Sequence, residues 1–104
     1  MEVTLLYFDG CPNWQTADKR LAALADELGV TVAHRKVTTP NEAEAVGFRG
    51  SPTILVDGRD PFARGDEPIG LSCRIYQTPD GPAGAPTSAQ LRAVLATGTG
   101  EGVR

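Results

Sequence analysis

The first 37 residues combine two strand patterns with one helical pattern, and this order restricts the folds open to the chain. Val3–Phe8 is a short apolar run that ends at Asp9-Gly10, as a buried central strand does. An amphipathic helix follows and ends at Gly29, a typical C-cap residue. Its apolar stripe consists of Ala17, Leu21, Leu24, Ala25 and Leu28. Val30–Val37 is β-branched and then basic, which favours a strand near a sheet edge. The three segments predict a parallel βαβ unit with a right-handed crossover.

The rest of the chain predicts shorter elements. They are a short helix over 42–46, strands over 51–58 and 72–77, and a final helix capped by Thr87 or Ser88. Residues 59–70 and 78–86 are polar or rich in glycine and proline, which predicts loops. The element order is therefore β-α-β-α-β-β-α. We expect one domain over residues 1–96 and a flexible C-terminal tail over residues 97–104.

Composition excludes several functional classes. A chain of 104 residues with 40% apolar and 22% charged residues is typical of one globular domain. Its net charge of −3 argues against nucleic-acid and anionic-membrane partners, because both require a basic surface. The N-terminus lacks the pattern of a signal peptide, and no apolar stretch approaches the ~18–20 residues that cross a bilayer. We therefore expect a cytoplasmic protein; the sequence leaves its oligomeric state open.

The cysteines, Cys11 and Cys73, are too few for a secreted disulfide scaffold. With one histidine and unrelated spacings, they do not predict a closed zinc site, and we expect no bound metal or cofactor. In a reducing compartment, such cysteines are either small buried residues or reactive thiols.

Three features together resemble the thioredoxin/glutaredoxin superfamily. The segment Cys11–Trp14 reads Cys-Pro-Asn-Trp and lies between the first strand and the first helix. Ser51-Pro52 opens the third strand, where that superfamily places a cis-proline beside the active cysteine. The element order matches nearly the whole chain, up to about Ala96. The resemblance implies a thioredoxin-like α/β fold in which a four-stranded mixed sheet is flanked by helices.

The sequence departs from the redox members of that superfamily at one position. Those members carry Cys-x-x-Cys, whereas Trp14 stands where the second cysteine would be. An indole there would cover the thiol or stack on a ligand. The resemblance therefore implies monothiol thiol–disulfide exchange at Cys11, with an external low-molecular-weight thiol as the resolving partner. The substrate would be a disulfide-containing protein or a small thiol, and whether the protein is an enzyme stays open.

The predicted position of Cys11 supports a reactive thiol. A thiolate at a helix N-terminus meets unpaired N–H groups and the positive end of the helix dipole, which lowers its pKa from about 8.5. Pro12 stiffens this turn at a position where its missing N–H has no consequence. Asp9 opposes the effect, because a nearby carboxylate disfavours a second negative charge. The alternative is a decayed site in which Cys11 is a small buried residue.

Cys73 is expected to lie apart from Cys11. It begins the last predicted strand, which should return toward the active-site end from the far side of the sheet. A five-residue strand spans roughly 17 Å, whereas a disulfide needs Cα atoms within about 7 Å. We therefore expect Cys73 to be buried or separately exposed, and to serve as a second thiol only if residues 59–70 refold locally.

The resemblance also assigns substrate-binding positions to Pro12, Trp14, Ser51 and Pro52. In the superfamily, the backbone of the residue before the cis-proline binds an extended peptide or a glutathione-like chain by strand addition. We accordingly expect a cis bond between Ser51 and Pro52.

Two further functions are open. Cys11, alone or with Cys73, would bind a soft ion such as Cu(I) or Hg(II). A non-catalytic module would instead bind partners through the strand edge beside Pro52. The charged residues of the later loops are expected to be solvated rather than to form a binding network. They are Arg59, Arg64, Arg74, Asp57, Asp60 and Asp66.

Overall fold

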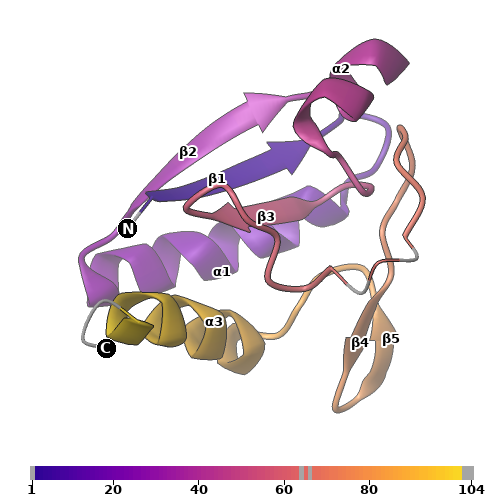
Figure 1. Ribbon diagram of the computed structural model, residues 1–104. Helices are drawn as coiled ribbons and strands as arrows, with labels where there is room; N and C mark the ends of the chain where they lie inside the picture. The colour runs from indigo at the N-terminus through magenta and orange to yellow at the C-terminus, as the bar shows by residue number, and fades with distance from the viewer. Residues whose placement is uncertain (1, 64, 66, 102–104) are drawn as a thin grey trace.

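A computed structural model describes residues 2–63, 65 and 67–101 of the chain, with side chains described as far as residue 96 (Figure 1). Its elements are β1 (Glu2–Tyr7), α1 (Asn13–Leu28), β2 (Thr31–Lys36), α2 (Pro40–Val46), β3 (Thr53–Val56), β4 (Tyr76–Thr78), β5 (Gly81–Ala83) and α3 (Ser88–Glu101). Arg64 and Asp66, which we expected to be solvated, lie outside the described residues.

The main sheet has the order β2-β1-β3 over the residues described. β1 pairs with β2 in parallel and with β3 in antiparallel, so that Leu5 lies between His34 and Ile54. This confirms the parallel βαβ unit, with α1 connecting β1 to β2. It also confirms that the apolar β1 is central and that the basic β2 is an edge strand.

The expectation of a four-stranded sheet is wrong. In the part of the chain that the structure describes, the segment expected to form the fourth strand does not join β2-β1-β3. Its last residues instead belong to β4, which pairs with β5 in a separate two-stranded hairpin beside the sheet (Figure 1). The physical reason is that residues 72–74 make hydrogen bonds to Ser51 and Asp60 instead of pairing with the sheet. Pro79 and Pro82 also lack the N–H that a central strand must donate.

Each face of the sheet packs against helices. α1 and α3 cover one face, where their leucines enclose Val3, Leu5 and Ile54 (Figure 1). α2 lies toward the other face, where Leu6 and Val37 pack with residues from α2 and the segment after it. That second cluster consists of Leu6, Val37, Ala43 and Phe48. The larger cluster therefore lies beneath β1 and β3, the strands that lead to the cysteines.

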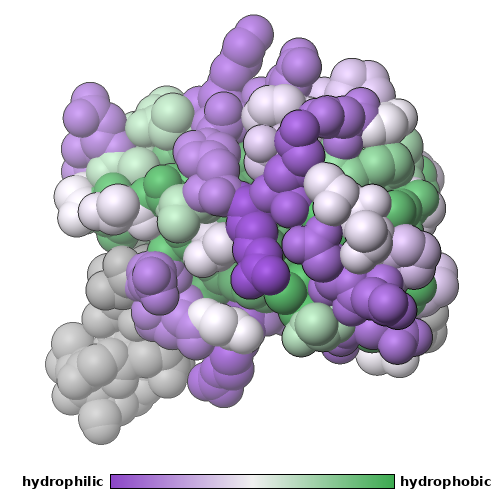
Figure 2. Space-filling model, turned by 90° about the horizontal axis from the view of Figure 1, so that it is seen from above, coloured by the Kyte–Doolittle hydropathy of each residue, from purple (hydrophilic) through white to green (hydrophobic). Residues whose placement is uncertain are grey.

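The edge strand β2 is exposed along most of its length. Its side chains include His34, whose Nε2 lies 2.6 Å from Asp18 Oδ1, and Lys36, whose Nζ lies 2.8 Å from Asp9 Oδ2. Figure 2 shows the molecule from above, with hydrophilic side chains spread over this face and smaller hydrophobic areas between them. Charged side chains on an edge strand discourage pairing with another strand.

α3 runs from Ser88 to Glu101 and therefore continues into the segment expected to be a tail. Residues 102–104 of that expected tail lie outside the described residues. Among the helices described, none is both long enough and apolar enough to cross a membrane.

Candidate functional site

Cys11 lies in the short connection between β1 and α1. Its side chain is completely buried, and its N–H donates to the Phe8 carbonyl at 3.4 Å. Pro12 is the N-cap of α1, with helical φ and ψ of −74° and −7°, and it carries no polar side-chain atom. The first amides of α1 and the positive end of its dipole therefore lie directly after Cys11, as the sequence predicts.

Cys11 and Cys73 form a disulfide. The two residues are 62 positions apart in the chain, and their Cα atoms lie 5.6 Å apart, within the usual range for a disulfide. The expectation that Cys73 stands apart from Cys11 is therefore wrong. Cys73 is an exposed residue, in contrast to the buried Cys11, so the pair has one sheltered and one accessible member.

The path of the chain after β3 explains this error. β3 has four residues and ends in a turn at Asp57 and Gly58, both with positive φ. The 14 positions from 59 to 72 could span roughly 46–50 Å if fully extended, well beyond the ~13 Å of β3. Cys73 thereby lies beside Ser51, before the start of β3, and makes an isolated parallel bridge with it. The long loop, rather than a strand, brings the cysteines together.

Ser51 connects the two cysteine segments. Its N–H donates to the Ser72 carbonyl at 2.7 Å, and its carbonyl accepts from the Arg74 N–H at 3.0 Å. The same carbonyl lies 3.7 Å from Cys11 Sγ. Its hydroxyl accepts from the Phe8 N–H at 3.3 Å, in the segment leading to Cys11. Ser51 is completely buried, and three of its polar groups thus fix the relative positions of residues 11 and 73.

The peptide bond between Ser51 and Pro52, which we expected to be cis, is cis in the structure. The backbone groups of Ser51 that were expected to bind an extended peptide are paired with residues 72 and 74 of the same chain. The edge beside Pro52 is therefore occupied by the segment that carries Cys73.

Trp14 lies in the first turn of α1, one turn beyond Cys11. Its ring stacks on Tyr7, with ring centroids 4.3 Å apart, and it is partly buried against the larger core. The indole thus packs on a ring of its own chain. Pro12, the fourth expected substrate-binding position, is exposed at the N-cap.

An ion pair follows Cys73 directly. Arg74 Nη1 donates to Asp60 Oδ2 at 2.7 Å, and both side chains are only 2% exposed. A second guanidinium N–H reaches Asp60 Oδ1 at 3.4 Å. Arg49 and Glu67 lie within 4 Å of this pair, so Arg74 and Asp60, which were expected to be solvated, instead belong to a partly buried network. Arg59 and Asp57 are exposed, as expected.

The contact between Asp60 and Arg74 was not expected from the sequence. The sequence feature that could have predicted a buried Arg74 is Tyr76, an aromatic residue two positions later. The guanidinium of Arg74 lies over the ring of Tyr76, 4.6 Å from its centroid, and the Phe62 ring packs edge-on against Tyr76. The Tyr76 hydroxyl donates to the Pro52 carbonyl at 2.6 Å, and burial raises the pKa of Tyr76 well above its usual value. An arginine two residues before a tyrosine, as in Arg74 and Tyr76, is consistent with a guanidinium that packs on that ring and pairs with a carboxylate.

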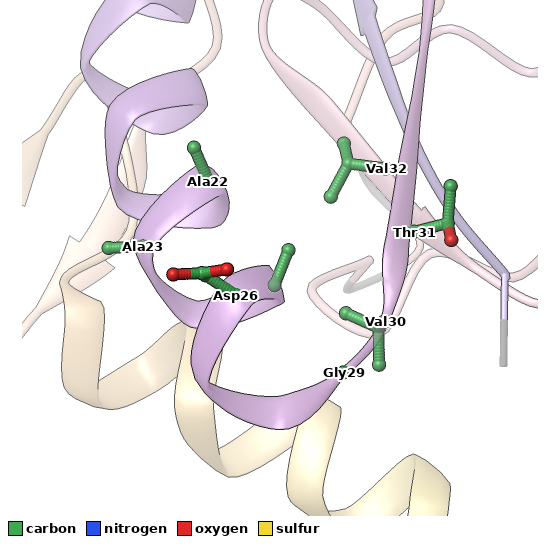
Figure 3. A pocket seen from close by; sticks show the side chains of 8 residues that line it. Ala22, Ala23, Asp26, Gly29, Val30, Thr31 and Val32 are labelled. Atoms are coloured by element: carbon green, nitrogen blue, oxygen red, sulfur yellow. The ribbon is translucent and has the colours of Figure 1, made fainter.

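Surface depressions elsewhere carry little chemistry. Figure 3 shows one between the C-terminal half of α1 and the start of β2, lined mainly by small side chains such as Ala22 and Val32. It lies ~16 Å along α1 from the cysteines, by the rise per residue of a helix. A smaller one, between α1 and the segment after β5, is lined by Asn13 and Gly84 and is nearer the disulfide in the fold. Among the described residues, no group of three or more metal-ligating side chains gathers.

Comparison with known proteins finds no matching family model and no curated protein of significant similarity. The site must therefore be interpreted from its own geometry.

Proposed function

We propose that this protein carries out thiol–disulfide exchange through Cys11 and Cys73, which alternate between a disulfide and two thiols. The observation that carries the proposal is the pairing of a buried cysteine at a helix N-terminus with an exposed cysteine from a distant loop. The resemblance of Cys11–Trp14 and Ser51–Pro52 to the thioredoxin/glutaredoxin superfamily supports it. A cytoplasmic location, which we propose as well, would also favour a transient disulfide over a permanent one.

Because the pair supplies two thiols, the second cysteine of the protein replaces the external resolving thiol of a monothiol mechanism. Since Cys73 is exposed and Cys11 is buried, we assign the first attack to Cys73. The Cys73 thiolate attacks a substrate disulfide, forms a mixed disulfide and releases one substrate thiolate, which takes a proton from water. The Cys11 thiolate then attacks Cys73 Sγ and releases the second substrate thiol. Two electrons pass from the protein to the substrate, and two external thiols later restore the reduced pair.

The N-terminus of α1 has a defined part in this scheme. Cys11 leaves as a thiolate when an external thiol opens the disulfide at Cys73. The unpaired amides and dipole of the 16-residue helix α1 stabilise negative charge at that end. The buried cysteine is thus the better leaving group, and the exposed cysteine is the one that outside thiols can reach.

Single cysteine variants test this assignment. Reduced Cys11→Ser is expected to react with oxidised glutathione and to retain a stable glutathione adduct on Cys73, because no second thiol is present to displace it. Reduced Cys73→Ser is expected to react at least about tenfold more slowly, because its remaining thiol is buried. Mass spectrometry of samples quenched with acid measures both adducts.

A result in which Cys73→Ser forms the adduct faster than Cys11→Ser would contradict the assignment of the first attack. The absence of an adduct on either variant after prolonged incubation, while urea-unfolded samples of both react, would contradict the proposed exchange itself.

A second function is favoured by the same pair. After reduction, two adjacent thiols from different segments form a two-ligand site for a soft ion such as Cu(I) or Hg(II). Titration of the reduced protein with Cu(I), in competition with a chromophoric chelator, separates this candidate from exchange alone. Soft-ion binding predicts one tight equivalent that both Cys11→Ser and Cys73→Ser abolish. Equal affinity in either single variant would contradict it.

A further inference from the structure

The segment carrying Cys73 has an anchor besides the disulfide. Asp60 lies in the loop that follows β3, and Arg74 lies immediately after Cys73. Their side chains meet at 2.7 Å with almost no exposure to water. Asp60 also accepts from the Phe62 N–H at 3.0 Å, which fixes the carboxylate within its own loop. The loop therefore presents a positioned carboxylate to the residue next to the reactive cysteine.

Arg74 is held on several sides. Its N–H donates to Ser51, its guanidinium lies over the Tyr76 ring, and its Cα and Cβ pack against Gly50. Gly50 has a φ of +102°, and a Cβ at this position would lie 3.0 Å from Arg74 Cβ. The close approach of residues 50 and 74 is thus built into the backbone, and Asp60 supplies the charge that balances the buried guanidinium.

Without Asp60, the buried guanidinium of Arg74 retains Glu67, 3.8 Å away, as its anionic neighbour. Loss of the closer partner at 2.7 Å is unfavourable, because the guanidinium stays desolvated while its pairing weakens. Undocking of residues 72–74 returns Arg74 to water but breaks its hydrogen bonds to Asp60 and Ser51. While Asp60 is present, the docked segment therefore has a stabilising interaction that does not depend on the disulfide.

We infer that Asp60 is a positioning residue for the redox pair: through Arg74, it keeps Cys73 against Cys11 after the disulfide is reduced. This inference rests on the proposed function. In this role, Asp60 raises the effective concentration of the Cys73 thiol at the Cys11 thiol. Effective concentration rises when two groups are held in place before they react. Asp60 touches neither sulfur nor substrate, so its action is through Arg74.

The equilibrium that Asp60 affects is the one between the protein thiols and glutathione. The reduced pair and one oxidised glutathione give the protein disulfide and two reduced glutathiones, with two electrons passing to glutathione. Loss of the Asp60–Arg74 pair releases the reduced segment, whereas the disulfide still holds the oxidised one. The reduced form is then favoured, and the equilibrium constant for disulfide formation falls.

Asp60→Asn and Arg74→Lys test the inference. Asparagine removes the charge while keeping the size of the side chain, and lysine keeps the charge but loses the two-pronged donor. We expect Asp60→Asn to lower the equilibrium constant with glutathione by about tenfold or more, and Arg74→Lys to lower it less. The measurement is alkylation of protein equilibrated at fixed glutathione ratios, followed by mass spectrometry.

Glu27→Gln is the matched control. It removes an acidic partner of an arginine, Arg92, in an exposed pair that joins α1 to α3 away from the cysteines. Its equilibrium constant should equal that of the unmodified protein. An Asp60→Asn value that also equals it would overturn the inference while leaving the proposed exchange intact.

Amide hydrogen exchange gives a second readout, which does not depend on thiol–disulfide exchange. In the fully reduced protein, the N–H groups of Ser51 and Arg74 should remain protected, because residues 72–74 stay docked. Asp60→Asn should speed exchange at both by about tenfold or more. If both amides exchange as fast in the reduced protein as in an unstructured peptide, the inference is overturned, whatever the result for the proposed function.

Discussion

At the scale of single residues, the positions of Cys11 and Cys73 depend on neighbours that carry no thiol. Ser51 bonds to the segments on both sides of the disulfide, and Gly50 lets Arg74 approach the backbone closely. Glycine is required at position 50 by both its positive φ and the lack of space for a Cβ.

Gly50→Ala is therefore expected to lower the free energy of unfolding by about 1–3 kcal/mol. Gly70→Ala is the control, because Gly70 has open space around its Cα and its φ lies outside the left-handed region. The control should change stability by less than about 1 kcal/mol. Chemical denaturation of both oxidised variants measures the difference, and equal stability of the two would show that residue 50 is not constrained by Arg74.

At the scale of elements, the disulfide lies at the start of α1, beside the segment of residues 50–52 that precedes β3. α2 ends shortly before that segment, at Gly47, and leads into the buried Phe48. Thr39 caps α2 by accepting from the Glu42 N–H at 3.1 Å. The helix therefore has a defined start, and its anchoring supports the connection to residues 50–52.

Thr39→Ala should lower the free energy of unfolding by about 1 kcal/mol, because the N-cap acceptor is lost. Thr16→Ala serves as its control, since Thr16 is exposed within α1 and alanine favours a helix interior. That control should retain or slightly increase stability in thermal unfolding. A loss at position 16 as large as that at position 39 would argue against the cap.

At the scale of the whole molecule, local patterns predicted the elements better than their long-range arrangement. The apolar run of β1, the stripe of α1 and the basic edge strand β2 follow from side-chain periodicity, and the structure confirms them. The position of Cys11 before α1 follows from the same pattern. These predictions depend on residues close together in the chain.

The pairing of Cys11 with Cys73 depended instead on the path of residues 59–72. Side-chain periodicity does not predict the path of an irregular loop. The sequence therefore predicts residues 72–77 as a further strand of the main sheet, which is wrong. The buried contact of Arg74 with Asp60, 14 positions earlier in the chain, fixes that path, and a contact between residues so far apart leaves no local pattern. The monothiol interpretation rested on Trp14, which stands where the second cysteine of Cys-x-x-Cys would be, and on the expected distance between Cys73 and Cys11; the structure contradicts the second of these.

The central claim is that Cys11 and Cys73 act as one reversible redox pair. Its most direct test is a titration of the unmodified protein through a series of glutathione ratios, with acid quenching, alkylation and intact-mass spectrometry. One two-electron transition is predicted, between a form with no alkyl groups and a form with two, and species with one alkyl group or one bound glutathione should stay minor. Accumulation of singly modified protein through the transition would show two independent thiols and would contradict the claim.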